Sequence, residues 1–98
     1  MNNRRNNEID MLFEAILSLN SVDECYRFFE DACTIKELKE IAQRFYVARL
    51  LDAGSNYQDV NQKTGVSTAT ISRVSKCLNY GDGGYSTVIE RLKKEGKI

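Results

Sequence analysis

The sequence predicts an all-α protein that forms a single domain over residues 1–98. Proline is absent, and residues that favour helices dominate the composition. Apolar residues recur at helical spacing along most of the chain. A hydroxyl residue followed three positions later by glutamate occurs at Ser21–Glu24 and Thr34–Glu37, a pattern that marks helix starts. Together these observations predict six helices.

The N-terminal third of the chain is predicted to hold a short arm and two helices. Residues 1–7 are polar and rich in asparagine, and we expect them to form a loose arm. An apolar stripe at helical period predicts a helix over residues 8–19. The next helix is expected over residues 22–31, with Ser21 in its cap. Its aromatic side chains exceed what one narrow stripe needs, so we expect it to pack against two neighbours.

The longest predicted helix covers residues 35–53 and ends at Gly54. Its apolar side chains spread around nearly the whole circumference, which indicates burial on more than one side. In so short a chain this predicts a central helix, at the core of a dimer. Residues 80–86 are rich in glycine and are expected to form a flexible joint. Ser86 is then expected to cap a last helix over residues 87–95.

Residues 56–79 are predicted to form two short helices joined by a tight turn. Asn56 is the expected cap of the first helix and Ser67 that of the second. Gly65 lies between them, where the backbone needs the positive φ that glycine tolerates best. The apolar residues expected to lock the two helices together are Val60, Val66, Ile71 and Val74. This arrangement is a helix-turn-helix, whose second helix lies in the major groove of DNA.

The outward face of the second helix has the chemistry of a DNA-reading surface. It begins with small hydroxyl and methyl groups, which let a helix approach the base edges closely. It continues with cations, which are suited to bind phosphates. The predicted DNA-contacting residues are Gln58, Lys63, Ser67, Thr68, Ala69, Thr70, Ser72, Arg73 and Lys76. The alternative is a solvated helix in an ordinary bundle. Asn61 and Thr64 depart from the pattern, because many such motifs place apolar residues at these two positions.

The formal net charge is zero, which by itself does not favour a nucleic-acid partner. The distribution of charge is more informative. Residues 1–55 carry ten acidic and seven basic side chains, whereas residues 56–79 carry one acidic and three basic ones. Positive charge therefore gathers on the predicted DNA-reading segment, where it steers association.

Several other classes of protein are not favoured. We find no apolar run long enough for a membrane span and no signal-peptide pattern. Histidine is absent, and the three cysteines have no metal-ligand spacing, so neither a zinc site nor a disulfide framework is expected. Cys25, Cys33 and Cys77 are instead expected to be free thiols in a reducing cytoplasm.

The chain resembles the Trp repressor family, and more closely the Trp repressor-like YerC/YecD group of bacterial regulators. The resemblance covers most of the chain from about Phe13 onward. It is carried by TIKELKEIAQRF, which opens the long helix at Thr34, and by TGVSTATISR in the recognition segment. The resemblance implies an intertwined, all-helical homodimer. It also implies a cytoplasmic regulator that binds a palindromic operator in double-stranded DNA.

The resemblance also implies a candidate ligand site. The family's repressor holds tryptophan between two arginines, which Arg44 and Arg73 match here, and Thr34 matches a threonine of the same pocket. Val74 stands where the repressor has a glycine that gives the indole room. Cys77 replaces a serine that binds the ligand's amino group, and a thiol is a poor partner. We therefore predict no cofactor and no response to tryptophan, with a corepressor that uses both arginines as the alternative.

The leading interpretation is a dimeric, sequence-specific transcriptional regulator that represses. A protein-interaction module, in which the helix-turn-helix docks a protein partner, is the second hypothesis. The polar and cationic outward face favours DNA over such a partner. An enzyme is the least favoured class, because the chain has neither histidine nor a recognisable pair of nucleophile and base.

Overall fold

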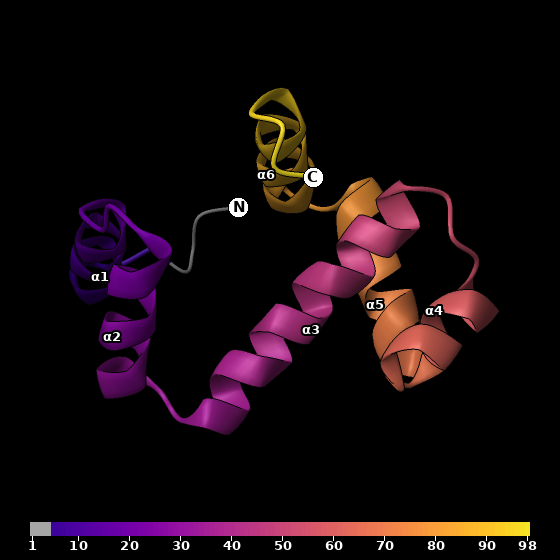
Figure 1. Cartoon of the computed structure of the whole chain (residues 1–98), viewed down its shortest axis with the longest axis horizontal. Coiled ribbons are helices and arrows are strands. Elements are labelled where there is room, and N and C mark those ends of the chain that lie inside the picture. The colour runs from indigo at the N-terminus through magenta and orange to yellow at the C-terminus, as the bar shows by residue number, and fades with distance from the viewer. Residues whose placement is uncertain (1–4) are drawn as a thin grey trace. The chain divides into compact units, whose positions relative to one another are not determined.

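The computed structural model describes residues 5–98, which form six helices and contain no strand (Figure 1). The helices are α1 (Asn7–Leu17), α2 (Val22–Ala32), α3 (Ile35–Asp52), α4 (Tyr57–Thr64), α5 (Thr68–Tyr80) and α6 (Gly84–Lys94). The predicted all-α class is confirmed. The chain divides into two compact units, one that ends at Leu38 and one that covers Lys39–Ile98.

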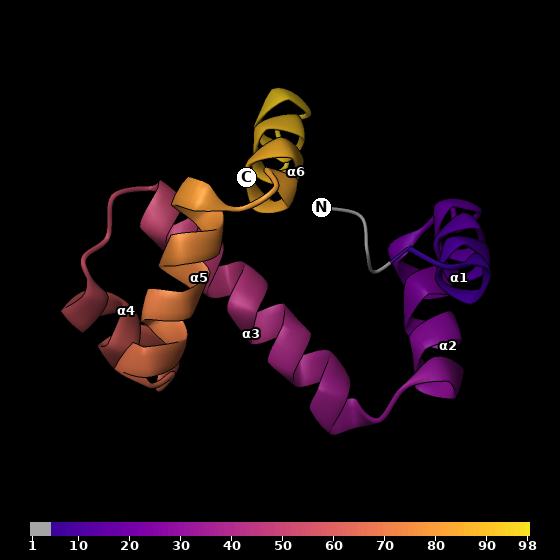
Figure 2. The same ribbon diagram turned by 180° about the vertical axis from the view of Figure 1, so that it is seen from behind.

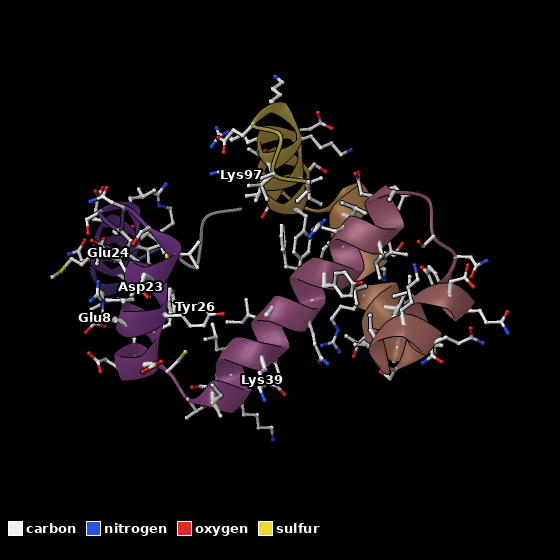
Figure 3. The ribbon with its side chains drawn as sticks, in the orientation of Figure 1. Glu8, Asp23, Glu24, Tyr26, Lys39 and Lys97 are labelled. Atoms are coloured by element: carbon white, nitrogen blue, oxygen red, sulfur yellow. The ribbon has the colours of Figure 1, made fainter. Side chains whose placement is uncertain are left out.

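The N-terminal unit starts its helices with side-chain caps. The Ile9 N–H donates to the Asn6 side chain at 2.8 Å, and the Glu24 N–H donates to the Ser21 hydroxyl oxygen at 3.1 Å. Acidic residues occupy the first turns of α1 and α2, where they favour the positive end of the helix dipole. Glu8 and Glu24 are among these residues (Figure 3). Both helix starts therefore follow from local sequence.

The ends of α1 differ from the prediction. Residues 1–4 lie outside the described part of the chain, and with them most of the predicted arm. The arm ends earlier than predicted, because Asn6 already caps α1 and Asn7 is its first helical residue. At the other end, α1 stops at Leu17 instead of residue 19. The Ser18 hydroxyl donates to the Ala15 carbonyl at 2.6 Å and so satisfies one carbonyl of the last turn.

The long helix α3 starts with a reciprocal capping box, as predicted. The Thr34 N–H donates to Glu37 Oε1 at 2.8 Å, and the Glu37 N–H donates to Thr34 Oγ1 at 3.1 Å. The hydrogen bond from the Thr34 backbone is the main cause that lowers the pKa of Glu37 from its ordinary 4.5, and the Thr34 hydroxyl adds to it. The charged carboxylate is therefore the form that caps α3.

The C-terminal unit contains the apolar core. Its buried residues come from α3, α4, α5, α6 and the turn before α5: Val47, Ala48, Val60, Val66, Ile71, Val74 and Ile89. Figure 2 shows α4, α5 and α6 from behind. The rings of Phe45 and Tyr85 lie 6.4 Å apart and connect α3 to α6. Lys93 of α6 also donates to Asp52 at the end of α3, at 2.8 Å. The core therefore joins the predicted helix-turn-helix to α3 and α6.

The glycine-rich segment differs from the prediction. The expected joint over residues 80–86 is wrong, because Tyr80 is the last residue of α5 and α6 begins at Gly84. Ser86 lies inside α6, and the residue at its N-cap is Gly83, with φ 86°. Packing explains the difference: Ile89 is buried, and Tyr85 packs on the core in the first turn of α6. Such contacts stabilise a helix start that local propensity does not favour.

Candidate nucleic-acid interface

The structure contains the predicted helix-turn-helix, formed by α4 and α5. The Asp59 N–H donates to the Asn56 side chain at 2.8 Å, as expected of a cap. Gly65 follows α4 with φ 73°, in the left-handed region predicted for it. Its N–H donates to the Asn61 carbonyl at 2.8 Å and closes the last turn of α4.

Ser67 caps the start of the recognition helix α5, as predicted. The Thr70 N–H donates to the Ser67 hydroxyl oxygen at 3.2 Å, and the Ser67 hydroxyl donates to Thr70 Oγ1 at 3.1 Å. Thr70 is half-buried. These two hydroxyl groups thus stabilise the helix start, and their contact with DNA stays a prediction.

The helix α5 has one apolar face and one polar face. Ile71 and Val74 are buried and Leu78 is half-buried. The exposed residues that were predicted to face DNA are Thr68, Ala69, Ser72, Arg73 and Lys76. Gln58 and Lys63 are exposed on α4, which packs against α5. The polar face of α5 therefore points away from the core and is open to a partner.

The electrostatics of this segment favour an anionic partner. Asp59 is its single acidic side chain, against Lys63, Arg73 and Lys76. The three basic residues are exposed. Exposed cations on a helix with small neighbouring side chains suit both the phosphates and the floor of a DNA groove.

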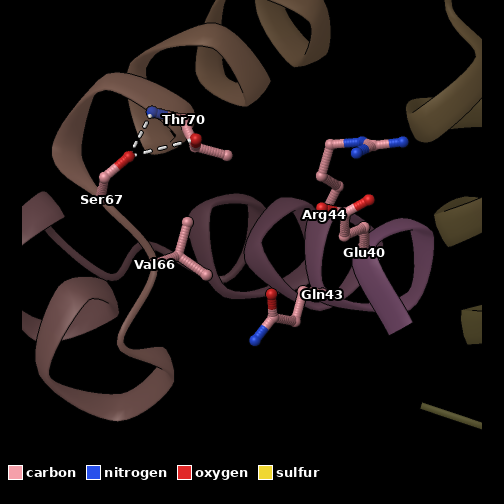
Figure 4. A pocket seen from close by; sticks show the side chains of 6 residues that line it. All are labelled: Glu40, Gln43, Arg44, Val66, Ser67 and Thr70. Carbon is pink, nitrogen blue, oxygen red and sulfur yellow. Dashed lines mark hydrogen bonds between the residues drawn. The ribbon is translucent and has the colours of Figure 1, made fainter. Parts of the chain in front are cut away.

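A polar pocket of about 210 Å³ lies between α3 and the start of α5 (Figure 4). Its lining residues are Glu40, Gln43 and Arg44 of α3 with Val66, Ser67 and Thr70. Arg44 is one of the predicted ligand-binding residues, whereas Glu40 and Gln43 were not predicted. Their spacing of three and four residues places all three side chains on one face of α3, a signal that was present in the sequence.

A larger groove of about 630 Å³ opens beside the other end of α5. Its lining residues are Ile41, Arg44, Phe45, Cys77, Gly81, Asp82, Gly84, Tyr85 and Val88. Arg44 thus lines both cavities. The other predicted ligand-binding residues are not among those that line the two cavities. Arg73 is exposed on α5, and Thr34 caps α3.

Between residues 5 and 98, no three side chains of His, Cys, Asp or Glu are grouped as a metal site requires. None of the helices described there has the length and apolar character needed to cross a bilayer.

Comparisons with known proteins agree with this geometry. The chain is 52% identical over 90 residues to the uncharacterized protein YerC of Bacillus subtilis (strain 168). The aligned residues cover 92% of this chain and 86% of that protein. The crystal structure of a TrpR-like protein from Eubacterium eligens ATCC 27750 matches with a TM-score of 0.90 and 52% identity. That match covers 95% of this chain and 96% of the other. A candidate Trp repressor from Staphylococcus aureus matches with a TM-score of 0.87 and 42% identity, over 91% and 89% of the two chains.

The sequence model of the family described as Trp repressor protein matches residues 7–93, which include all of the helix-turn-helix. The predicted resemblance and the six-helix Trp repressor-like fold are thereby confirmed. The chain belongs to the Trp repressor family.

Proposed function

We propose that this protein is a sequence-specific transcriptional repressor that acts in the cytoplasm as a homodimer on a palindromic operator. The observation that carries the proposal is the polar, cationic face of α5, presented by a helix-turn-helix in a chain of the Trp repressor family. An apolar face would instead suit a protein partner. The proposed partners are double-stranded DNA and a second copy of the chain, without a cofactor.

The homodimer is supported by the apolar side chains that a single chain leaves exposed. The N-terminal unit has no buried residue among those described, and it exposes large apolar groups on each of its helices. The exposed residues of this kind are Met11, Leu12, Phe13, Leu17, Val22, Tyr26 and Ile35. Exposed apolar groups in such number are typical of a surface that another chain covers. A second copy is the simplest such chain, because most soluble oligomers are symmetric assemblies of identical chains.

The contribution of α5 to DNA binding is tested by two substitutions on its exposed face. The probe is the duplex that the wild-type chain enriches most from a random pool. Its length of about 30 base pairs is enough to hold two half-sites one helical turn apart. We expect Lys76→Ala to weaken binding to this duplex and to a scrambled one alike, and to reduce the salt slope by about one. Thr68→Ala is expected to cost about 1–3 kcal/mol at one base position of each half-site.

Lys39→Ala is the matched control, because Lys39 is an exposed lysine of α3 outside the helix-turn-helix. It should leave both affinities and the salt slope unchanged. If neither substitution on α5 changes DNA binding, the helix-turn-helix is a docking site for a protein, as in the second hypothesis above.

A further part of the proposal is that tryptophan does not control DNA binding. The Val74 side chain is 2% exposed and packs in the core. This side chain of α5 therefore fills the space between the helix and the core, and it stabilises the helix without a ligand. Cys77 offers a thiol, a weak hydrogen-bond partner for an amino group. A ligand changes DNA affinity only when it binds the two states of a protein with different affinities.

We therefore expect DNA affinity to be the same with and without L-tryptophan at fixed salt. Calorimetric titration of the free protein with L-tryptophan should show no saturable heat. A saturable heat accompanied by a several-fold gain in DNA affinity would restore the corepressor hypothesis, and Arg44→Ala and Arg73→Ala would then show whether both arginines bind the ligand.

A further inference from the structure

Asn61 and Thr64, the two residues of α4 that depart from the usual motif, both form hydrogen bonds at the turn before α5. Asn61 Nδ2 donates to the Val66 carbonyl at 2.8 Å. The Val66 N–H donates to Thr64 Oγ1 at 3.1 Å, and the Thr64 hydroxyl in turn donates to the Val60 carbonyl at 2.7 Å. The two side chains of α4 thus bind both polar backbone groups of Val66. We call this set of three hydrogen bonds the Asn61–Thr64 brace.

The brace acts at the point that sets the direction of the recognition helix. Val66 lies between Gly65, which ends α4, and Ser67, which caps α5. The Val66 side chain is buried in the core, which draws its backbone groups away from water. Buried backbone N–H and C=O groups require partners, and here the partners come from the preceding helix. The backbone that enters α5 is therefore attached to α4 by polar bonds as well as by apolar packing.

The three hydrogen bonds also depend on one another. The Thr64 hydroxyl accepts from Val66 and donates to Val60, so one side chain connects the last turn of α4 to the turn that follows. All three bonds are partly buried, where water competes less for the same groups. An apolar residue at either position would remove partners without replacing them. The polar residues at 61 and 64 thus have a structural reason that the sequence pattern alone does not show.

We propose that Asn61 and Thr64 are positioning residues for DNA recognition, which hold α5 at its reading angle relative to α4 in the ligand-free protein. This inference rests on the proposed function, because the angle matters only if α5 reads a duplex. In this role, two side chains of the protein itself order the recognition helix. A protein whose binding-competent state is already populated needs no ligand to reach it.

The proposal differs from a role in stability alone. Loss of general stability lowers the fraction of folded protein and weakens binding to every duplex. If α5 is no longer held at a fixed angle to α4, the protein stays folded and its cations stay in place, so binding through phosphates persists. Recognition of base edges, which depends on the placement of α5, is lost selectively. The ratio between affinities for the selected and the scrambled duplex therefore separates the two roles.

The test uses two pairs of variants in the full chain. Asn61→Ala removes the donor to Val66. Its control, Asn79→Ala, removes an amide donor of the same kind at an exposed position within α5, where Asn79 Nδ2 donates to the Ser75 carbonyl at 3.0 Å and to the Ser75 hydroxyl oxygen at 3.3 Å. Thr64→Val removes the hydroxyl at nearly constant shape, whereas Thr64→Ser retains it. Each variant is measured for affinity and salt slope on the selected and the scrambled duplex. The exchange of the Val66 amide and the α4–α5 angle are followed by NMR in the DNA-free protein.

We expect Asn61→Ala, which removes one partly buried hydrogen bond, to lower affinity for the selected duplex about five- to tenfold. Thr64→Val removes two such bonds and should lower this affinity at least as much. Affinity for the scrambled duplex and both salt slopes should stay at wild-type values. The Val66 amide should exchange faster in Thr64→Val, and the α4–α5 angle should vary more in both variants. Asn79→Ala and Thr64→Ser should match the wild type in every measurement.

Three results would overturn the inference. Wild-type selectivity in both brace variants would show that the angle does not need these bonds, and the proposed function would stand. An equal loss on both duplexes would assign the two residues to stability alone. If the wild-type chain enriches no duplex, the proposed function fails and the recognition role of the brace fails with it. If Asn61→Ala does not fold, the difference in duplex selectivity between Thr64→Ser and Thr64→Val still decides the matter.

Discussion

Replacing Ile71 by alanine is expected to lower the free energy of unfolding by about 3 kcal/mol, the largest effect of any substitution considered for α5. Ile71 is 0% exposed and packs in the core that joins α5 to the rest of the C-terminal unit. Removing most of a buried isoleucine side chain loses its transfer free energy and leaves a cavity, which together cost about 2–5 kcal/mol in protein cores. The stability of a domain of this size is itself only about 5–15 kcal/mol.

The measurement is denaturant unfolding at one fixed protein concentration, because association changes the apparent stability. Ser72→Ala is the control: Ser72 is the next residue of α5 and is exposed, so its change should stay within about 0.5 kcal/mol. A loss below about 1 kcal/mol for Ile71→Ala would show that the core around α5 is not packed as described.

The second large effect is expected from a charge placed on the apolar surface of the N-terminal unit. Leu17 is 78% exposed on α1, and Met11 on the same helix is exposed as well. If a second chain covers this surface, Leu17→Glu buries an unpaired carboxylate and removes an apolar contact. We expect the dissociation constant of the dimer to rise about a hundredfold or more.

Analytical ultracentrifugation at micromolar concentration measures this effect. The wild type should sediment as one species of about twice 11.2 kDa, and Leu17→Glu should dissociate or unfold. Asn7→Glu adds the same charge to the exposed first residue of α1 and should remain dimeric. A stable wild-type monomer would contradict the proposed homodimer directly.

The parts of the fold that depend on neighbouring residues were predictable from the sequence. Some features need only a few adjacent side chains: the caps at Asn56 and Ser67, the positive φ of Gly65, and the capping box of α3. The buried face of α5 also follows, because its apolar residues recur at helical spacing. These local signals were sufficient for the helix-turn-helix, and the family resemblance added the six-helix architecture.

The parts that depend on distant contacts were not predictable in the same way. The start of α6 was placed too late, because its first turn is stabilised by Tyr85 packing against Phe45 of α3. The pocket beside Arg44 requires α3 to approach the start of α5, which no local pattern specifies. The hydrogen bonds of Asn61 and Thr64 depend on the path of the turn, so these residues first appeared as departures from the motif.

The proposed function requires that α5 reads the sequence of DNA as part of a two-fold symmetric dimer. Selection of duplexes from a random pool by the wild-type chain of residues 1–98 tests this requirement. We expect enrichment of a palindromic sequence whose half-sites lie about one helical turn apart, a spacing for which Trp repressor is itself a known example. Enrichment of no sequence, or of one without two-fold symmetry, would contradict it.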